Sequence, residues 1–450
     1  MPDFQLPQFS TRADDFYGQV KRSRSGREET NIQPYITFTR RGTWIVCWTQ
    51  TSEEVEPGQR PDQRAVCSRS TDEGRAFGPE IVIEDADNRG EDLPPLPDYT
   101  APTTAGSDRI THEGGSPTVE PPTCRARVPA WPMVFTAPYL DRVYAFYWYN
   151  ANGSVYRDAG FLCFKYSDDD GVTWSQRHRV PIRRTAIDEP GFDMHGWNFG
   201  PPIVLQNGKV MLSFTKIRPT TVPQLFENWY TEVFFLVADN LLGETDPSRL
   251  RFTTYPEGER GLIVPNSKTG RPFAQEATVV SLSSGRLLAV MRTDTGFIYY
   301  ATSDSYGASW TDPAVFRASP DGIPLRQPVC PAPLTKLSDG RYVLLFHNND
   351  GTANGGVGPY ASLRNRTPLW LACAREARGV EENGGLIFGP PRVIIENDVR
   401  PKGQTNRTDI SYQRFFQRRD RYFVVYNHRK LDINVHEVDP AVVGDTGLPV

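Results

Sequence analysis

The residue pair with the clearest chemical spacing is Glu276 and Arg292, in the segment AQEATVVSLSSGRLLAVMRT. Two runs of β-forming residues enclose the turn SSG, a pattern typical of a hairpin. Because the strands of a hairpin run antiparallel, its two ends return to the same place, which predicts Glu276 and Arg292 as neighbours. Arginine binds carboxylate groups through a planar fork, so this end of the hairpin is a candidate site for an acidic group. A surface glutamate and a strand-end arginine without a joint function are the alternative.

A second candidate stretch, GFDMHGWNFGPP, contains His195 and Trp197 before a predicted strand. Histidine transfers protons near neutral pH, and a tryptophan ring can stack on a sugar. The segment FHNND places His347 at the end of another hairpin, from which it can reach the same pocket. Local packing is the alternative for all three residues.

The elements that must position these side chains are short strands joined by tight turns. Apolar β-forming runs flank NG, SG or DG in VLQNGKVMLSF, VVSLSSGRLLAVM and PLTKLSDGRYVLLF, which is a hairpin signal. The composition agrees: aromatic residues make up 12% of the 450 residues, and 37 Gly and 39 Pro favour turns over long helices. The chain is therefore predicted to be all-β.

A further motif occurs three times, as STDEGRAF at residues 70–77, SDDDGVTW at 167–174 and, more weakly, SDSYGASW at 303–310. Its residues fit a self-contained turn: the aspartate caps backbone amides, the glycine takes a positive φ, and the aromatic ring fills the space between sheets. Three copies, each after a strand-like run, indicate a repeated structural unit.

These copies are Asp-box repeats, S-x-D-x-G-x-x-W, and with them the chain resembles the sialidase (neuraminidase) superfamily over about residues 30–440. The resemblance implies a six-bladed β-propeller with four antiparallel strands per blade, whose radial repetition protects the sheet edges. We expect residues 1–450 to form a single domain, with a long loop insertion at about residues 84–128. The expected blade cores are near residues 32–50, 130–165, 200–237, 276–300, 329–374 and 410–438.

The resemblance also implies catalytic roles. Sialidases carry a glutamate before the second carboxylate-binding arginine of the same hairpin, which matches Glu276 and Arg292, and this glutamate activates a tyrosine nucleophile. The tyrosine falls on Tyr412 in ISYQRFFQ, and the third arginine falls on Arg366, with Arg364 as the alternative. A tyrosine has an ordinary pKa near 10, so it needs such a base. Burial of the pair next to arginine is expected to lower the Tyr412 pKa. A packed strand tyrosine and loop cations are the alternatives.

The sequence departs from the family at two matched positions. The family's first arginine opens a segment R-I-P, whereas the run IQPYITF places Gln33 there. The glutamate that holds this arginine in the family is replaced by Asn427. Both charged partners have become neutral amides, which indicates a remodelled pocket. The acid/base aspartate of the family falls in SEEVEPGQRPDQR, where Asp62 is favoured over Glu54 and Glu56.

The loss of one arginine changes the expected substrate. A charge-assisted contact between arginine and a carboxylate contributes about 1.5–3 kcal/mol, so its loss weakens sialic-acid binding by roughly ten- to a hundredfold. A different acidic sugar or linkage is then expected, unless Arg326 or Arg364 replaces the missing cation.

Charge and composition argue against several partner classes. The net charge of −4 does not favour a nucleic-acid partner, and no apolar run is long enough for a membrane span. The six cysteines lack CxxC spacing, so no metal site and no cofactor are expected. The N-terminal MPDFQLPQFS lacks a signal-peptide pattern; this predicts a cytoplasmic protein, or a secreted one whose signal was trimmed.

Three functions fit these observations. The first is an exo-acting, sialidase-like glycoside hydrolase that removes a terminal acidic sugar from a glycan or oligosaccharide. The second is a polysaccharide lyase acting on a uronate, in which His195 or Tyr412 removes the C5 proton. The third is a propeller that binds glycans without turnover.

Overall fold

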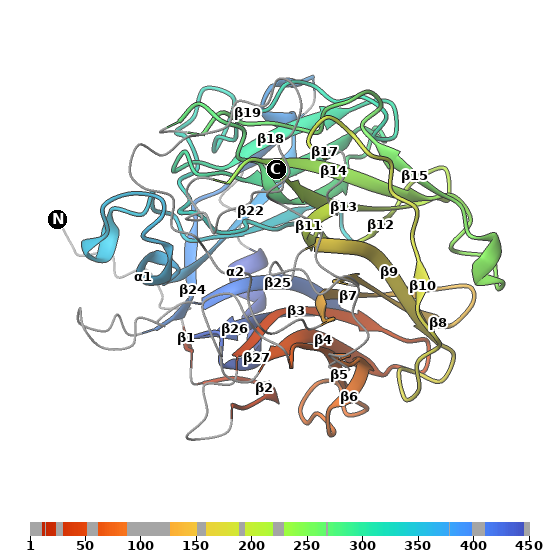
Figure 1. The fold of residues 1–450 in the computed structure, drawn as a ribbon. Coiled ribbons are helices and arrows are strands. Elements are labelled where there is room, and N and C mark those ends of the chain that lie inside the picture. The colour runs from red at the N-terminus through yellow and green to blue at the C-terminus, as the bar shows by residue number, and fades with distance from the viewer. Residues whose placement is uncertain are drawn as a thin grey trace, which may run out of the picture.

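The computed structural model of the chain is built almost entirely from β-strands (Figure 1). The helical segments described are short: α1 (Ser362–Asn365), α2 (Pro440–Gly444), η2 (Pro247–Arg249), η3 (Ala353–Gly355) and η4 (Glu382–Gly385). The structure describes residues 11–13, 15–23, 30–51, 62–87, 127–150, 159–188, 194–218, 229–266, 269–377, 379–397 and 410–444.

Three of the sheets in the described residues contain four antiparallel strands each. The first is formed by β3 (Thr30–Phe38), β4 (Trp44–Thr51), β5 (Arg64–Ser70) and β6 (Ile81–Glu84). The second is formed by β16 (Gln275–Ser281), β17 (Leu287–Arg292), β18 (Tyr299–Ser303) and β19 (Ala314–Val315). The third, in spatial order, is formed by β2 (Gly18–Lys21), β27 (Asp432–Val438), β26 (Arg421–His428) and β25 (Ile410–Arg418).

Two larger sheets complete the arrangement. The six-stranded sheet contains β1 (Thr11–Arg12), β24 (Arg392–Glu396), β22 (Leu369–Glu376), β21 (Tyr342–Phe346) and β20 (Leu334–Lys336), with β23 (Leu386–Phe388) paired to β22. The nine-stranded sheet contains β15 (Phe252–Tyr255), β14 (Thr231–Ala238), β13 (Val210–Ile217), β11 (Met194–Phe199), β9 (Ala159–Ser167), β8 (Arg142–Tyr149), β7 (Pro129–Ala137), β10 (His178–Arg179) and β12 (Ile203–Val204).

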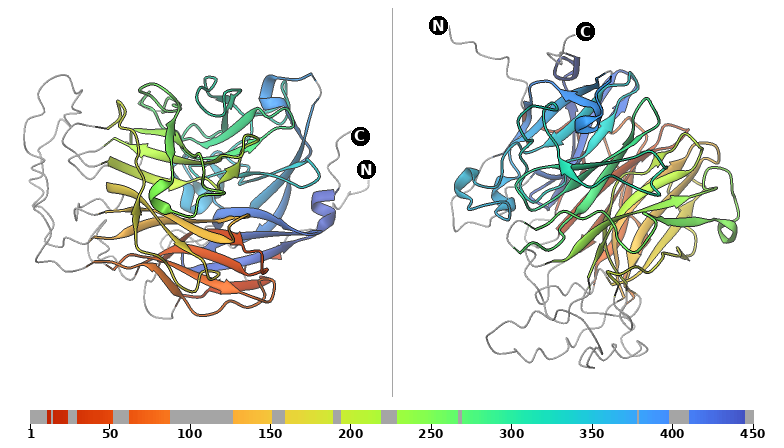
Figure 2. Two further views of the ribbon diagram at one scale, coloured as in Figure 1. Left: turned by 90° about the vertical axis from the view of Figure 1, so that its right-hand side faces the viewer. Right: turned by 90° about the horizontal axis from the view of Figure 1, so that it is seen from above.

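Figure 1 shows the sheets following one another around a centre in a propeller-like arrangement, and Figure 2 shows the same molecule from two further sides. The expected all-β propeller-like fold is thus confirmed. The described residues form five hydrogen-bonded sheets rather than the six separate sheets expected. The reason is local: Met194 pairs with Gly160 and His195 with Ala159, which joins β11 to β9.

The central strands of the sheets are buried on both faces. Every residue of β4, β8, β13 and β17 is buried. Apolar and aromatic residues run almost continuously along β8 and β17. Strands β4 and β13 also bury polar side chains, among them Gln50 and Lys216. Burial of these faces contributes most of the stability of such a fold, at roughly 25 cal/mol per Å² of apolar surface.

The ring is closed by the two ends of the described chain. Strand β2 near the N-terminus pairs antiparallel with β27, through Gly18 opposite Val435 and Gln19 opposite Asn434. Figure 1 shows the red strand β2 beside the blue strand β27. One sheet is therefore assembled from residues at opposite ends of the sequence.

The Asp boxes form the turns that their sequence predicts. In the first, Ser70 Oγ accepts a hydrogen bond from the Gly74 amide at 2.9 Å, and Asp72 accepts one from Ala76 at 3.0 Å. The second copy repeats these contacts at residues 167–174. In the third, serine replaces the capping aspartate: Ser305 Oγ accepts from the Ser309 amide at 2.8 Å. The three boxes begin at the last residues of β5, β9 and β18. The hairpin turns between β3 and β4 and between β16 and β17 lie at the same end of their sheets, which we call the Asp-box end.

The predicted insertion at about residues 84–128 lies mostly outside the described residues. On its two sides, Asp87 and Arg127 form a short antiparallel bridge, with the Asp87 amide donating to Arg127 at 2.8 Å. The single-domain organisation over residues 1–450 and the nature of the insertion remain predictions.

Candidate active site

The first strand of five hairpin units, β3, β7, β11, β16 and β25, carries the same irregularity, whereas the pairing of β20 with β21 is regular. In each, the pairing register shifts by one residue, which marks a β-bulge. At each bulge stands a non-glycine residue with a left-handed φ between +45° and +66°. These five bulge residues are Gln33, Trp131, Asn198, Glu276 and Tyr412, and all are buried. Positive φ at such residues is costly and clusters at functional sites, and a bulge redirects a side chain.

Glu276 is the best-connected of the bulge residues. Its Oε2 accepts a hydrogen bond from Arg292 Nη1 at 2.7 Å, so the two residues are neighbours as the hairpin predicts. Its Oε1 accepts from Trp197 Nε1 at 2.8 Å and from Asn198 Nδ2 at 2.7 Å. Burial raises the pKa of Glu276, but the Arg292 charge and these donors outweigh it and hold the pKa below its ordinary value. Glu276 is therefore a buried, ionised carboxylate.

Tyr412 and Arg366 lie next to this pair and come from two further sheets or their loops. The Arg366 guanidinium carbon is 5.8 Å from the centroid of the Tyr412 ring, and both side chains are buried. The expectation that the Tyr412 pKa falls is wrong. Burial, together with the charge of Glu276, raises the pKa of Tyr412 to about 12, and the opposing charges of Arg366 and Arg292 do not compensate. Loss of hydration outweighs the two nearby cations.

Of the two arginines considered for the third position, Arg366 is the one beside Tyr412. It follows α1 and donates through Nη2 to the carbonyl of Val329 at 2.8 Å. Arg364 lies within α1, where its carbonyl accepts from Asn354 Nδ2 at 3.1 Å and its Nη1 lies near Gly355.

Gln33 and Asn427 are in contact, as the matched loss of two charges predicts. Asn427 Oδ1 accepts a hydrogen bond from the backbone amide of Gln33 at 2.6 Å, and Asn427 Nδ2 donates to the Asn31 carbonyl. Both residues are 0% exposed. The asparagine thus holds the bulge backbone rather than the glutamine side chain.

Trp197 and His195 both lie on β11 but have different surroundings. The Trp197 ring is 7% exposed, with its centroid 4.4 Å from Trp131 and 5.1 Å from Trp229. It holds Glu276 through its N–H, a role different from the sugar stacking considered above. His195 is also buried, and burial lowers its pKa to about 4 against the raising effect of Asp188. The imidazole is consequently neutral at neutral pH.

The remaining candidates lie at different places. His347 follows β21; its amide donates to Gln327 Oε1 at 2.7 Å and its Nδ1 is 3.2 Å from the Pro368 carbonyl. Asp62 is half-buried and stands two residues before β5, at the end of the first sheet that also carries Gln33. Arg326 points outward: its side chain is 61% exposed, with Asp350 at 3.9 Å. It does not join the buried cluster.

Asn198 lies in the candidate stretch GFDMHGWNFGPP. Sequence reasoning missed two residues that contact the buried cluster, Tyr35 and Arg414. The Tyr35 hydroxyl bonds to Asn198 Oδ1 at 2.6 Å and to the Phe199 carbonyl, and it accepts from Arg414 Nη2 at 2.8 Å. Tyr35 and Arg414 each stand two residues after a bulge residue on the same strand. That spacing was the available signal, since residues two apart on a strand share a face.

Two general features of the described residues bear on the class of protein. No group of three or more histidine, cysteine, aspartate or glutamate side chains is placed to hold a metal ion within the described ranges. None of the helices described has the length and apolar character needed to cross a membrane.

Comparison with known proteins agrees with this fold. The BNR repeat-like domain family matches residues 122–425. The sialidase NanB of Streptococcus pneumoniae, solved as a K499G mutant, aligns with 94% of this chain and 71% of its own at 12% identity and a TM-score of 0.56. The intramolecular trans-sialidase of Ruminococcus gnavus aligns with 96% of this chain and 98% of its own at 13% identity and a TM-score of 0.54. A protein of unknown function from Dyadobacter fermentans aligns at 14% identity over 94% of this chain and 98% of its own, with a TM-score of 0.54. The search of curated proteins gave no match.

The repeated Asp-box turns, the ring of sheets and the family match define a propeller-like BNR-repeat protein. The chain belongs to the BNR repeat-like domain family.

Proposed function

We propose that the chain forms six blades, with the nine-stranded sheet counting as two. One blade would consist of β7 to β10 and the next of β11 to β15. In support, each half has its own bulged first strand, at Trp131 and at Asn198. Only two residue pairs join β9 to β11, against eight between β13 and β14.

We propose that the buried cluster is the active site of a sialidase-like exo-glycoside hydrolase that removes a terminal acidic sugar. The observation that carries this proposal is the meeting of Glu276, Arg292, Arg366 and Tyr412 from three different sheets at one end of the ring. A nucleophile, a base and two cations together are the groups that such a reaction needs.

In the proposed reaction, Tyr412 Oη forms a bond to the anomeric carbon while the glycosidic C–O bond breaks. The phenolic proton passes to Glu276, and Asp62 is proposed to protonate the leaving oxygen. A phenol with a pKa of about 12 is scarcely ionised at neutral pH, so attack depends on this proton transfer. Sialidases use a tyrosine in place of the usual second carboxylate of glycosidases.

Substrate preference follows from the cations. Arg292 and Arg366 are proposed to hold the sugar carboxylate, and the Gln33–Asn427 contact supplies neutral groups where the family has an arginine and its glutamate. One cationic contact fewer predicts weak binding of ordinary sialosides, and we propose another acidic sugar, such as a terminal uronide, as the better substrate. The other predicted residues, His347, Trp197 and Arg364, are proposed to shape the pocket.

A uronate lyase is the second candidate. It is supported by the two buried arginines near Tyr412, which could neutralise a uronate carboxylate while Tyr412 or His195 removes the C5 proton. With a pKa of about 4, the His195 imidazole would act as a neutral but weak base.

The decisive experiment compares a fluorogenic sialoside with uronide-terminated oligosaccharides and identifies the products by mass. If the combined mass of the two products exceeds the mass of the substrate by one water, the reaction is hydrolysis. An unsaturated uronate absorbing in the ultraviolet supports the lyase. Binding of these glycans without turnover, unchanged in Tyr412→Phe, would reject both enzymatic proposals in favour of a glycan-binding propeller.

A further inference from the structure

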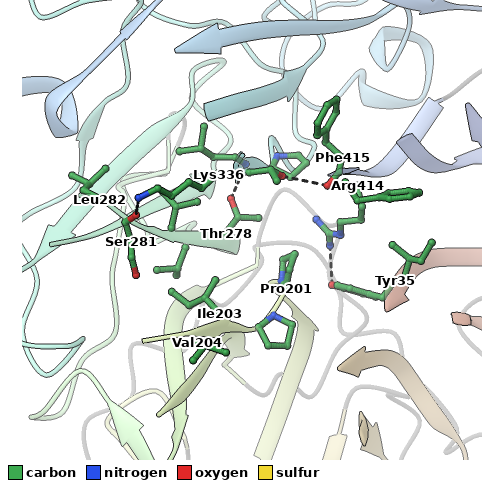
Figure 3. Close-up of a pocket in the computed structure, with 18 of the residues that line it drawn as sticks. Tyr35, Pro201, Ile203, Val204, Thr278, Ser281, Leu282, Lys336, Arg414 and Phe415 are labelled. Atoms are coloured by element: carbon green, nitrogen blue, oxygen red, sulfur yellow. Dashed lines mark hydrogen bonds between the residues drawn. The ribbon is translucent and has the colours of Figure 1, made fainter. Parts of the chain in front are cut away.

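A buried hydrogen-bond network links Arg414 on β25 with Glu276 on β16. Arg414 Nη2 donates to the Tyr35 hydroxyl at 2.8 Å, and Figure 3 shows the guanidinium directed at that oxygen. The Tyr35 hydroxyl donates to Asn198 Oδ1 at 2.6 Å, and Asn198 Nδ2 donates to Glu276 Oε1 at 2.7 Å. Tyr35 lies on β3, two residues from the bulge toward the Asp-box end, and Asn198 lies on β11. Each of the four residues is at most 5% exposed, so the network is shielded from bulk solvent.

The hydrogen bonds of this network all run in one direction, from the cation to the anion. Burial, together with the charge of Glu276, raises the pKa of Tyr35 above its ordinary value against the effect of Arg414, so the hydroxyl keeps its proton. Its oxygen accepts from Arg414, which leaves the O–H for Asn198 Oδ1 and the nearby Phe199 carbonyl. Asn198 Oδ1 also accepts from the Phe199 amide at 2.6 Å. With its oxygen held on this side, the Asn198 amide presents its N–H donors to Glu276.

The network also connects the buried charge of Arg414 to an opposite charge. Within the described residues, the guanidinium bonds to Tyr35, while Nε and Nη1 have no hydrogen-bond partner there. A buried cation is costly without a compensating charge, and hydrogen bonds in series polarise one another in a low-dielectric interior. Glu276 is the ionised group at the other end of this polarised series.

Both oxygens of the Glu276 carboxylate are held by donors. Oε2 accepts from Arg292 Nη1, and Oε1 accepts from Trp197 Nε1 as well as from Asn198. The charge of Glu276 also contributes to the raised pKa of Tyr412. A base acts only when its oxygen is within reach of the proton it takes, and small displacements lower the rate. The orientation of this carboxylate is therefore a condition for the proposed proton transfer from Tyr412.

We propose that Arg414, Tyr35 and Asn198 are positioning residues for the proposed base. Acting through one another, they hold the Glu276 carboxylate in the orientation that takes the proton from Tyr412. This inference rests on the proposed hydrolase function. It implies that loss of the Tyr35 hydroxyl releases the Asn198 amide, and with it the carboxylate, from two hydrogen bonds away.

The test compares Tyr35→Phe, which removes the hydroxyl alone, with Tyr147→Phe as a matched control. Tyr147 is also fully buried and donates to a carboxylate, Glu84, at 2.5 Å, but it lies on β8 outside the network. With the better of the sialoside and uronide substrates, Tyr35→Phe should lower kcat about ten- to a hundredfold and change KM less than about threefold. KM is retained because the proposed carboxylate-binding residues, Arg292 and Arg366, are unchanged. Tyr147→Phe should keep the kcat of the unmodified chain.

The pH dependence of kcat separates positioning from packing. Asn198 donates to the ionised form of Glu276, so a weaker hold raises the pKa of Glu276. Because the base must be ionised, the acid limb of the kcat profile should move to higher pH in Tyr35→Phe, by at least about half a unit. It should stay in place in Tyr147→Phe. The other ionisable groups that face Glu276 are the same in both variants: Arg292, Arg366 and Tyr412.

Two further comparisons examine the other members of the network. Asn198→Ser has a side chain too short to reach from Tyr35 to Glu276, and it should reproduce the loss in kcat even if Tyr35→Phe fails to fold. Arg414→Lys keeps the cation and should retain more kcat than Arg414→Met, because the charge still orients the Tyr35 hydroxyl.

A last measurement needs no substrate. Tyr35→Phe should lower the free energy of unfolding in urea by more in the unmodified chain than in Glu276→Gln, where the anion is absent. Tyr147→Phe should have the same effect in both. If the unmodified chain turns over none of the substrates, the proposed function fails and the catalytic role of the network fails with it. If the chain is active, the positioning role alone is overturned by a Tyr35→Phe variant that matches Tyr147→Phe in kcat and acid limb, that loses only in KM, or whose effect on stability is additive with Glu276→Gln.

Discussion

The Asn427 side-chain oxygen accepts a hydrogen bond at 2.6 Å from the backbone amide of Gln33, a residue whose own backbone is left-handed. The asparagine therefore fixes the bulge of β3 from the neighbouring sheet. Because both residues are fully buried, changes at either position affect folding as well as binding. The effects of changing the two positions should therefore depend on one another.

The double variant Gln33→Arg with Asn427→Glu should raise sialoside affinity, because it restores a third cation together with its acidic holder. Each single variant should lower stability by several kcal/mol, since each buries one charge without its partner. The double variant should be more stable than the sum of the single effects by more than 1 kcal/mol. Urea unfolding and sialoside titration of all four proteins measure this. Additive effects would show that the two positions act independently.

Glu276→Gln should abolish turnover and also lower stability, by about 3–5 kcal/mol, because it leaves the buried Arg292 without its counter-charge. Adding Arg292→Met should recover much of that stability without recovering activity. Chemical denaturation of the two variants gives the comparison. Equal stability of the single and double variants would show that the ion pair is not energetically coupled.

Tyr412→Phe should reduce turnover by at least about a hundredfold while leaving the fold intact, as judged by circular dichroism. The raised pKa has its own consequence for stability. Folding favours the neutral phenol, so its contribution of about 3 kcal/mol is fully present below pH 10 and is lost as pH rises through about 12. Unfolding between pH 9 and 12 should thus depend less steeply on pH in Tyr412→Phe. Identical profiles would contradict the raised pKa.

His195→Asn should weaken the dependence of stability on acid. The folded-state pKa of about 4 is below the ordinary value of 6.5, so the stabilising contribution is present above pH 6.5 and disappears as pH falls through 4. The full effect is about 3 kcal/mol. His436 provides a matched comparison, because burial also lowers its pKa to about 4. We expect His436→Asn to reduce the loss of stability between pH 7 and pH 4.5 by a similar amount. Urea midpoints at pH 7 and pH 4.5 distinguish the outcomes, and an unchanged difference in His195→Asn would reject this assignment.

Short-range patterns were enough to predict much of the molecule. Turn residues between β-forming runs placed Glu276 beside Arg292, and the Asp boxes predicted both the turn contacts and the propeller-like ring. The proximity of Gln33 and Asn427 could be predicted because these residues replace an arginine and the glutamate that holds it in the family that the sequence resembles.

The arrangement at the bulges was not predictable in the same way. Left-handed φ is usually marked by glycine, whereas Gln33, Glu276 and Tyr412 adopt it through contacts between distant segments. The joining of β9 to β11 likewise depends on two residue pairs without a sequence signature. The direction of the Tyr412 pKa shift depends on the balance of burial and charge at specific distances, which residue types alone do not give.

The pairing of β2 with β27 has a consequence for how the protein is made. During synthesis, β2 leaves the ribosome long before β27 has been made. The backbone N–H and C=O groups of β2 that bond to β27 therefore have no partner while most of the chain is translated. Closure is then a late event with a large loop-entropy cost, and folding should be slow for a chain of this size. Until the final strands arrive, the nascent ring has two open edges, which makes it a candidate client for chaperones.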